Sequence, residues 1–302
     1  MVVTPEASGW ASKSMPELLL KPMPAFRPAF DQCVTQGLAE LARSRVAFVG
    51  LARNCAPQLY GNLVRFARLA EAAQQWWLHI ETNDNEDETD QLLVDFCNDN
   101  PQATFTSQRL GHEQFGAEFA GRRTVAMAAH RTACQTWVRE NAADADYVVA
   151  IDWDSWGGWT HDGTLTGLAW LLLMPSAYGM ASVSLFQHNW GDGPTWAHYD
   201  CWALRLNSTW DDFLANQGNW KYTWLPPVGS PPVPVCSAFG GLAIYRTADY
   251  LAGTYDGSDC EHVPFHDSIA RATGRTLAIN PSQRCIMHWL PEAADAGQHS
   301  ND

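Results

Sequence analysis

An alternation of strand-like and helix-like segments over residues 45–151 constrains the fold more than any other feature of the sequence. β-rich runs that end in polar residues alternate with segments of helical character, and in 59–73 the apolar residues recur at a spacing of about 3.6. The expected strands are 45–54, 75–82, 104–111 and 147–151, and the expected helices are 59–73, 90–100 and 117–140. Strands separated by helices predict an α/β fold with a doubly wound, mostly parallel sheet, whose ligand crevice lies beyond the carboxyl ends of the strands.

The second half of the sequence differs in composition and is rich in tryptophan. Residues 153–224 hold ten of the fifteen tryptophans. The apolar stretch 165–186 is broken by Pro175 and Gly179 and has no cationic flank, so it predicts a helix, a turn and a buried strand rather than a membrane span. Further along we expect a strand within 236–247, a helix at 267–274 and a last strand from residue 276.

The charge balance argues against one class of function. The 302 residues include 33 acids and 19 Lys plus Arg, which gives a net charge of −14. Nucleic-acid binders need basic patches that replace the counterions of phosphates, so we expect no nucleic-acid partner. The N-terminus lacks the basic and then apolar layout of a signal peptide, and the cysteines form no C-x-x-C pair. These features predict a soluble, cytoplasmic protein with reduced thiols.

A pair of acids follows the expected strand 147–151, in the segment "DYVVAIDWDSWGGW". Residues i and i+2 of an extended chain project to the same side, so Asp152 and Asp154 should face one way. Two carboxylates at a ligand-binding edge repel each other unless a cation joins them, and their hard oxygens suit Mg²⁺ or Mn²⁺. Such a metal could hold a nucleoside diphosphate. The plain alternative is a surface turn with two solvated acids.

The order of several segments resembles that of GT-A-fold glycosyltransferases. The nearest likeness is to capsule-type mannosyltransferase relatives and to similar viral and bacterial sugar transferases, and it covers about residues 45–290. The segments that carry the resemblance are "VAFVGLARN", "IETNDNEDET", "RRTVAMAAHRTACQTWV", "VVAIDWD", "YDCWALR", "SAFGGLAIYRT" and "DCEHVPFH".

The resemblance implies a set of residues that bind the nucleotide. The end of the first strand receives the base and ribose, and Glu81 would accept a hydrogen bond from a ring N–H or a sugar hydroxyl. Arg131 would steady the diphosphate, because its guanidinium is a fixed fork of donors. Glycines before a strand let the backbone approach a sugar closely. The implied set is Leu51, Ala52, Arg53, Glu81, Arg123, Arg131, Asp152, Trp153, Gly240 and Gly241.

The resemblance also implies catalytic and metal-binding roles. If the reaction inverts the anomeric centre, an outcome that the resemblance leaves open, Glu261, or else Asp259, would deprotonate the acceptor hydroxyl as general base. The sequence departs from the usual double acid here, because His262 follows Glu261. Asp200 would bind sugar hydroxyls. His288 matches the position of an additional metal ligand, which gives Asp152, Asp154 and His288 as the expected metal site.

We therefore expect a metal-dependent glycosyltransferase that takes a UDP- or GDP-linked sugar as donor and a glycan or other hydroxyl as acceptor. An alternative is a non-catalytic lectin-like or nucleotide-sugar-binding protein. A sugar nucleotidyltransferase would need a glycine- and lysine-rich phosphate loop, and an oxidoreductase a G-x-G-x-x-G turn; both are absent. The candidates for an acceptor groove are Trp156, Trp159, Trp196 and Trp202; of the ten tryptophans in 153–224 we expect two or three at the site and the rest in the core. The expected organisation is an N-terminal extension (1–44) followed by one domain (45–302). Within that domain we expect a nucleotide-binding half (45–154) and an acceptor half (155–290).

Overall fold

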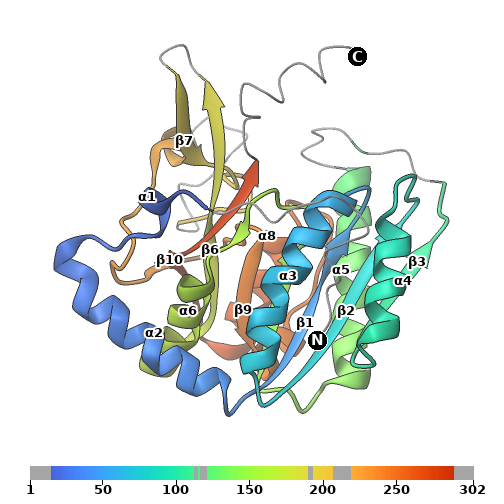
Figure 1. Ribbon diagram of the computed structural model, residues 1–302, viewed down its shortest axis with the longest axis horizontal. Coiled ribbons are helices and arrows are strands. Elements are labelled where there is room, and N and C mark those ends of the chain that lie inside the picture. Colours follow the sequence, from blue (N-terminus) through green and yellow to red (C-terminus); the bar gives the residue numbers. More distant parts are fainter. Residues whose placement is uncertain (1–14, 112–114, 116–120, 190–192, 207–218, 289–302) are drawn as a thin grey trace.

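The computed structural model describes residues 15–111, 115, 121–189, 193–206 and 219–288. Its strands form one sheet in the order β3-β2-β1-β4-β9-β6-β10-β5, and β7 pairs with β6 and β8 with β10. The helices cover both faces of this sheet (Figure 1).

The strands that were expected begin and end within a few residues of the expected positions, and three further strands, at 158–159, 194–198 and 233–235, were not expected. They are β1 (Arg45–Ala52), β2 (Gln75–Asn83), β3 (Ala103–Gln108), β4 (Tyr147–Asp152), β5 (Gly158–Trp159), β6 (Ala177–Asn189), β7 (Pro194–His198), β8 (Val233–Val235), β9 (Leu242–Arg246) and β10 (Thr276–His288).

The helices alternate with the strands in the first half of the chain. They are α1 (Glu17–Leu20), α2 (Arg27–Leu41), α3 (Ala56–Ala72), α4 (Thr89–Asp99), α5 (Arg122–Asn141), α6 (His161–Leu173), α7 (Thr247–Ala252) and α8 (His262–Thr273), with 3-10 turns η1 (Pro24–Phe26) and η2 (Asn219–Thr223). The stretch 165–186 forms a helix, a turn and a strand, as predicted. No helix within the described ranges is long and apolar enough to cross a membrane.

The sheet is mixed but mostly parallel among its central strands, which confirms the expected mostly parallel α/β sheet, while the antiparallel direction of β9 was not expected. Strands β3, β2, β1 and β4 are parallel to one another, and β6 is parallel to β10 in the same direction. Strand β9 lies between β4 and β6 and is antiparallel to both. Most of the central strands therefore still end at one common edge of the sheet.

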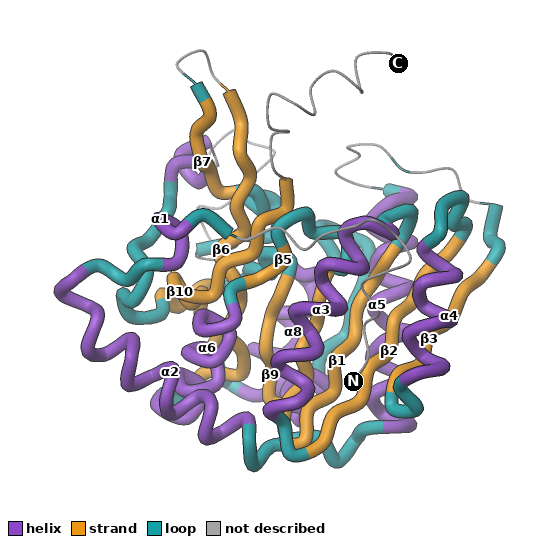
Figure 2. The backbone as a smooth tube through the Cα atoms, viewed as in Figure 1, coloured by secondary structure: helices purple, strands orange, loops and turns teal. Residues whose placement is uncertain are grey.

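Side chains on the central strands alternate between two hydrophobic layers. Phe48 points to the layer that contains Leu63 of α3, whereas its neighbour Val49 points to the layer that contains Val138 of α5 and Phe265 of α8. Figure 2 shows α3 and α4 on the near side of the orange strands and α5 on the far side. Burial on both faces fixes the register of these strands, because a slip of one residue would exchange the two layers.

The described part of the N-terminal segment packs against the sheet's helices. Helix α2 lies along α6, and a Cβ on Gly37 would meet the carbonyl oxygen of Leu165 at 1.8 Å. A glycine at this point therefore lets the two helices approach closely.

Candidate functional site

A cavity of about 240 Å³ opens at the carboxyl ends of β1, β2 and β4. Strand β1 and the turn after it contribute Leu51, Ala52 and Arg53, and β2 contributes Glu81 and Asn83. The sheet brings these residues together because neighbouring parallel strands end at the same edge. Three of the expected nucleotide-binding positions and the expected acid therefore share one cavity.

Asp152 and Asp154 both line this cavity. Trp153, between them, points to the opposite side and is fully buried, with its ring 5.9 Å from both Phe66 and Trp159. The alternation of an extended chain explains this difference. It also corrects the expectation that the Trp153 side chain takes part in nucleotide binding, because that side chain belongs to the core beneath β4.

The electrostatic environment of Asp154 favours the protonated acid. The surrounding protein desolvates the carboxylate, although the side chain remains exposed at the cavity, and the negative charge of Asp152 opposes it. Both effects raise the pKa of Asp154 to about 6. A cation bound between these two acids would remove that repulsion.

Arg131 connects two of the acids in the cavity. It lies buried on α5, with Nη2 2.5 Å from Oδ1 of Asp152 and Nε 3.7 Å from Oε1 of Glu261. Its guanidinium carbon lies 4.7 Å from the centre of the Phe239 ring. Burial would lower the pKa of Arg131, but the charges of Asp152 and Glu261 reverse this and raise it. Arg131 is therefore charged at all pH values of interest.

Arg123 and Asp200 also line the cavity. The Arg123 guanidinium lies over the ring of Trp202, 5.6 Å from its centre. The Asp200 carboxylate accepts a hydrogen bond of 2.9 Å from the backbone N–H of Gly240. Burial raises the pKa of Asp200.

Glu261 and His262 occupy the start of α8 and both line the cavity. Burial raises the pKa of Glu261, while Arg131 acts in the opposite direction. Burial and the charge of Arg131 lower the pKa of His262, so its ring is neutral near pH 7. That ring is stacked on Phe239 at 3.9 Å, and neither of its nitrogens has a hydrogen-bond partner in the described residues.

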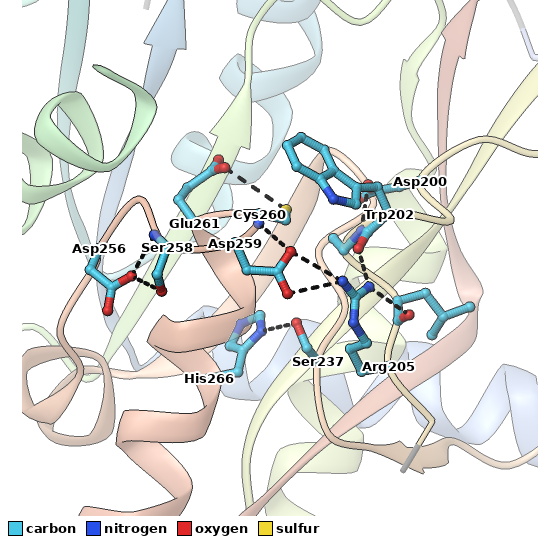
Figure 3. A network of polar contacts seen from close by, with 12 residues as sticks. Asp200, Trp202, Arg205, Ser237, Asp256, Ser258, Asp259, Cys260, Glu261 and His266 are labelled. Atoms are coloured by element: carbon cyan, nitrogen blue, oxygen red, sulfur yellow. Dashed lines mark hydrogen bonds and ion pairs between the residues drawn. The ribbon is translucent and has the colours of Figure 1, made fainter. Parts of the chain in front are cut away.

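Asp259 does not line the cavity. Its two carboxylate oxygens lie 3.2 and 3.1 Å from Nη2 of Arg205, and one of them also accepts the backbone N–H of Cys260 at 2.7 Å. Figure 3 shows the Asp259 carboxylate turned toward Arg205, whereas that of Glu261 points away from this pair. Arg205 also donates to the carbonyl of Trp202. Asp259 thus ties the loop before α8 to the segment that carries Asp200, and the structure does not place it as a base.

Gly240 and Gly241 form a turn that their lack of a Cβ permits. Their φ angles are 70° and 82°, values that residues with a Cβ rarely adopt. A Cβ on Gly240 would lie 2.2 Å from the carbonyl oxygen of Ser182, and one on Gly241 would lie 2.6 Å from the sulfur of Met287. Gly241 lines the cavity, and Gly240 acts on it through the hydrogen bond to Asp200.

A buried polar network holds Glu81 in place. Oε1 of Glu81 lies 2.8 Å from Nε2 of His79, whose Nδ1 lies 2.9 Å from the hydroxyl of Thr104. The His79 ring is stacked on Trp137, with 4.9 Å between ring centres. This network fixes the direction in which Glu81 faces the cavity.

His288 lies at the exposed end of β10 and does not line the cavity. Among the residues that the structure describes, no group of three His, Cys, Asp or Glu side chains is arranged to hold a metal ion. Of the expected metal ligands, the structure therefore brings Asp152 and Asp154 to one cavity and leaves His288 outside it.

The tryptophans expected at an acceptor groove have different environments. Trp159 is buried in the core, Trp196 is half-buried, and Trp156 is 47% exposed. Trp202 lines the cavity. The tryptophan-rich acceptor region stays a prediction, and Trp190 and Trp210 lie outside the described residues.

Several residues that line the cavity were not predicted from the sequence, and three of them are Asn83, Phe239 and His262. Asn83 falls two residues after Glu81, so the strand period already placed it on the same side. Phe239 and His262 stack on each other at the centre of the site, and their adjacency to the glycine pair and to Glu261 was the available signal.

No protein-family model and no curated protein matches the chain. Solved structures match at low sequence identity. The structure of GalNAc-T7 with UDP, GalNAc and Mn²⁺ matches with a TM-score of 0.50 and 10% identity, over 96% of this chain and 60% of that one. A mannosyltransferase from Pyrobaculum calidifontis in complex with GDP-Man and Mn²⁺ matches with a TM-score of 0.48 and 15% identity, over 87% and 66% of the two chains.

Glucosyl-3-phosphoglycerate synthase of M. tuberculosis matches with a TM-score of 0.47 and 12% identity, over 86% of this chain and 76% of that one. The chain spans less than two thirds of the GalNAc-T7 and mannosyltransferase structures. At these identities the likeness concerns the fold. Together with the strand order and the cavity at the strand ends, it shows that the chain has a GT-A-like glycosyltransferase fold.

Proposed function

We propose that the protein is a metal-dependent glycosyltransferase that moves a hexosyl group from a UDP- or GDP-linked sugar to a hydroxyl of a glycan or another acceptor. One observation carries the proposal: Asp152, Asp154, Arg131 and Glu261 converge in one cavity at the carboxyl ends of parallel strands. The GT-A-like fold supports the same reaction class, and the GalNAc-T7 structure that shares it holds UDP and Mn²⁺.

The donor set of the cavity fits a hard divalent cation. Asp152 and Asp154 both face the cavity, and the charge of Asp152 helps to raise the pKa of Asp154, an effect that a cation would relieve. Carboxylate oxygens are the ligands that Mg²⁺ and Mn²⁺ prefer. These two residues would hold the ion, which when bound neutralises charge on the leaving diphosphate. His288 as a third ligand remains a proposal.

The remaining cavity residues divide into binding and chemical roles. Arg131 and Arg123 bind the diphosphate oxygens, and Glu81 accepts a hydrogen bond from the base or ribose. Leu51, Ala52 and Arg53 line the wall on which the base and ribose lie.

Glu261 takes the proton of the acceptor hydroxyl as the acceptor oxygen forms its bond to the anomeric carbon. The bond between that carbon and the diphosphate oxygen breaks, and the nucleoside diphosphate leaves with the electron pair. The raised pKa of Glu261 makes it a stronger base than a solvated carboxylate. Asp200, which also lines the cavity, binds sugar hydroxyls.

A donor panel tests this proposal. Purified protein with Mn²⁺ is screened by thermal shift against UDP- and GDP-linked hexoses, and the donors that bind are assayed for release of the nucleoside diphosphate. A cognate donor at a hundredfold excess over its Kd should stabilise the protein by about 2.7 kcal/mol. Binding without release, with every acceptor offered, would favour the non-catalytic nucleotide-sugar-binding alternative.

Asp154→Asn tests the metal assignment. The variant should lose at least about a hundredfold in transfer rate because the amide is a weaker ligand for a hard cation. Its melting temperature should not fall, since Asp154 is exposed. Asp95→Asn is the matched control, because Asp95 is an exposed acid on α4 away from the cavity. Full activity of Asp154→Asn would refute the assignment.

A further inference from the structure

Arg131 is bonded to a carboxylate that would hold the metal. Its Nη2 lies 2.5 Å from Oδ1 of Asp152, and the pair is partly buried, with side-chain exposures of 3% and 22%. The guanidinium already neutralises this carboxylate and occupies one of its oxygens, so it competes with a divalent cation for the same negative charge. The arrangement therefore describes a competition between a residue of this chain and the ion.

We propose that Arg131 is a built-in counter-ion, which neutralises Asp152 in the empty site and moves to the diphosphate of the donor when the cation binds. This inference rests on the proposed function and adds to it the order in which the site is filled. It makes Asp152 fully available to the ion only when a nucleoside diphosphate is present.

The charges of the cavity explain why a counter-ion is needed. Five acids line the cavity, and Glu261 among them is almost fully buried; the five are Glu81, Asp152, Asp154, Asp200 and Glu261. A buried charge without a partner costs several kcal/mol. Arg131 lies within 4 Å of two of these acids, Asp152 and Glu261, so it stabilises the empty site.

Two nitrogens of the same guanidinium make no hydrogen bond to the described residues. Nε and Nη1 of Arg131 are buried and have no hydrogen-bond partner among the described residues. A buried donor without a hydrogen-bond partner costs free energy. Phosphate oxygens match the forked arrangement of the guanidinium N–H groups. A diphosphate in the cavity would therefore satisfy donors that Asp152 and Glu261 leave unused.

The counter-ion makes binding of the cation and of the nucleotide cooperative. A cation that binds alone competes with Arg131 for Asp152, and if the guanidinium is displaced it stays buried without its closest partner. A cation that binds with a nucleoside diphosphate provides Arg131 with another anion. Each ligand should therefore raise the affinity for the other by the same factor.

Two arginine variants test the inference by calorimetric titration of MnCl₂ into nucleotide-free protein. Arg131→Met should bind Mn²⁺ about tenfold more tightly than the wild type, because the competitor for Asp152 is gone. Arg123→Met is the matched control: it removes the same charge from the same cavity, but the Arg123 guanidinium lies over Trp202. It should change the affinity by less than about threefold, the effect of a charge that acts across solvent.

The outcomes separate this inference from the proposed function. If the wild type binds Mn²⁺ together with UDP or GDP but Arg131→Met is no tighter than the wild type, the counter-ion is refuted and the function stands. Equal tightening in both variants would also refute it, because a general loss of positive charge would suffice. If the wild type binds no Mn²⁺ with either nucleotide, the proposed function itself fails.

A second measurement uses the wild type and so does not depend on the stability of a variant. In a crystal structure with Mn²⁺ and UDP or GDP, the Arg131–Asp152 contact should be longer than a hydrogen bond and Arg131 should donate to phosphate oxygens. A contact still within hydrogen-bond distance would overturn the inference.

Discussion

At the scale of single residues, the environment of Glu261 decides what its carboxyl can do. Burial raises its pKa, and the guanidinium of Arg131, 3.7 Å from Oε1, acts in the opposite direction and favours the ionised form. A carboxylate in this position is more basic than a solvated one. The two opposing effects suit a group that accepts a proton from a hydroxyl.

Glu261→Gln should therefore lower kcat by about 10²- to 10⁴-fold, the usual contribution of a general base, with little change in the KM for the donor. Steady-state kinetics with the donor found in the panel measures this. Glu140→Gln, an exposed acid at the end of α5, should leave both constants unchanged. If Glu261→Gln keeps the wild-type kcat, the base is another residue of the cavity, with Asp200 next to be tested.

The site residues also show which features a local sequence pattern can predict and which it cannot. The positions of Asp152 and Asp154 followed from the period of two in an extended chain, and the same period turns Trp153 into the core. Asp259 is tied to Arg205, 54 residues earlier in the sequence, through a pair that no local pattern reveals. Such contacts depend on tertiary structure, so the roles of Asp259 and His288 stay predictions.

At the scale of the elements, most of the strands and helices could be predicted because each buries a face with its own period. Strand β1 alternates between two hydrophobic layers, and α3 presents one apolar stripe. The direction of β9 could not be predicted in this way. Its antiparallel pairing with β4 and β6 depends on a long connection, and an apolar strand reads the same in either direction.

The turn before β9 gives a prediction at this scale. Gly240→Ala should destabilise the protein by about 2–4 kcal/mol, because the residue has φ near 70° and its Cβ would meet a carbonyl oxygen at 2.2 Å. Gly274→Ala has φ of 68° but no atom within 4 Å of the added Cβ, so it should lose about 1 kcal/mol. Urea unfolding measures both, and an equal loss in the two variants would contradict the steric explanation.

At the scale of the whole molecule, the two hydrophobic layers enclose ionisable groups whose charge state depends on folding. His198 and His266 are fully buried, and burial lowers their pKa to about 4 and about 3. His262 is shifted in the same direction. The acids Asp154, Asp200 and Glu261 are shifted upward and act in the opposite sense at low pH. The acid stability of the fold is the sum of these two sets.

The histidine contribution has a definite sign. The pKa of His198 falls from 6.5 to about 4 on folding, so between these values the unfolded chain binds a proton that the folded protein does not. Its contribution to stability is complete above pH 6.5 and is lost as the pH falls through this window, by about 1.4 kcal/mol per pH unit. We expect the free energy of unfolding of His198→Gln to fall less steeply with falling pH than that of the wild type, by about 1.4 kcal/mol per pH unit. Urea unfolding at about pH 7, pH 6 and pH 5 measures both slopes. His288→Gln, which changes an exposed ring, should retain the wild-type slope, and the same slope in His198→Gln would show that His198 is protonated in the folded protein.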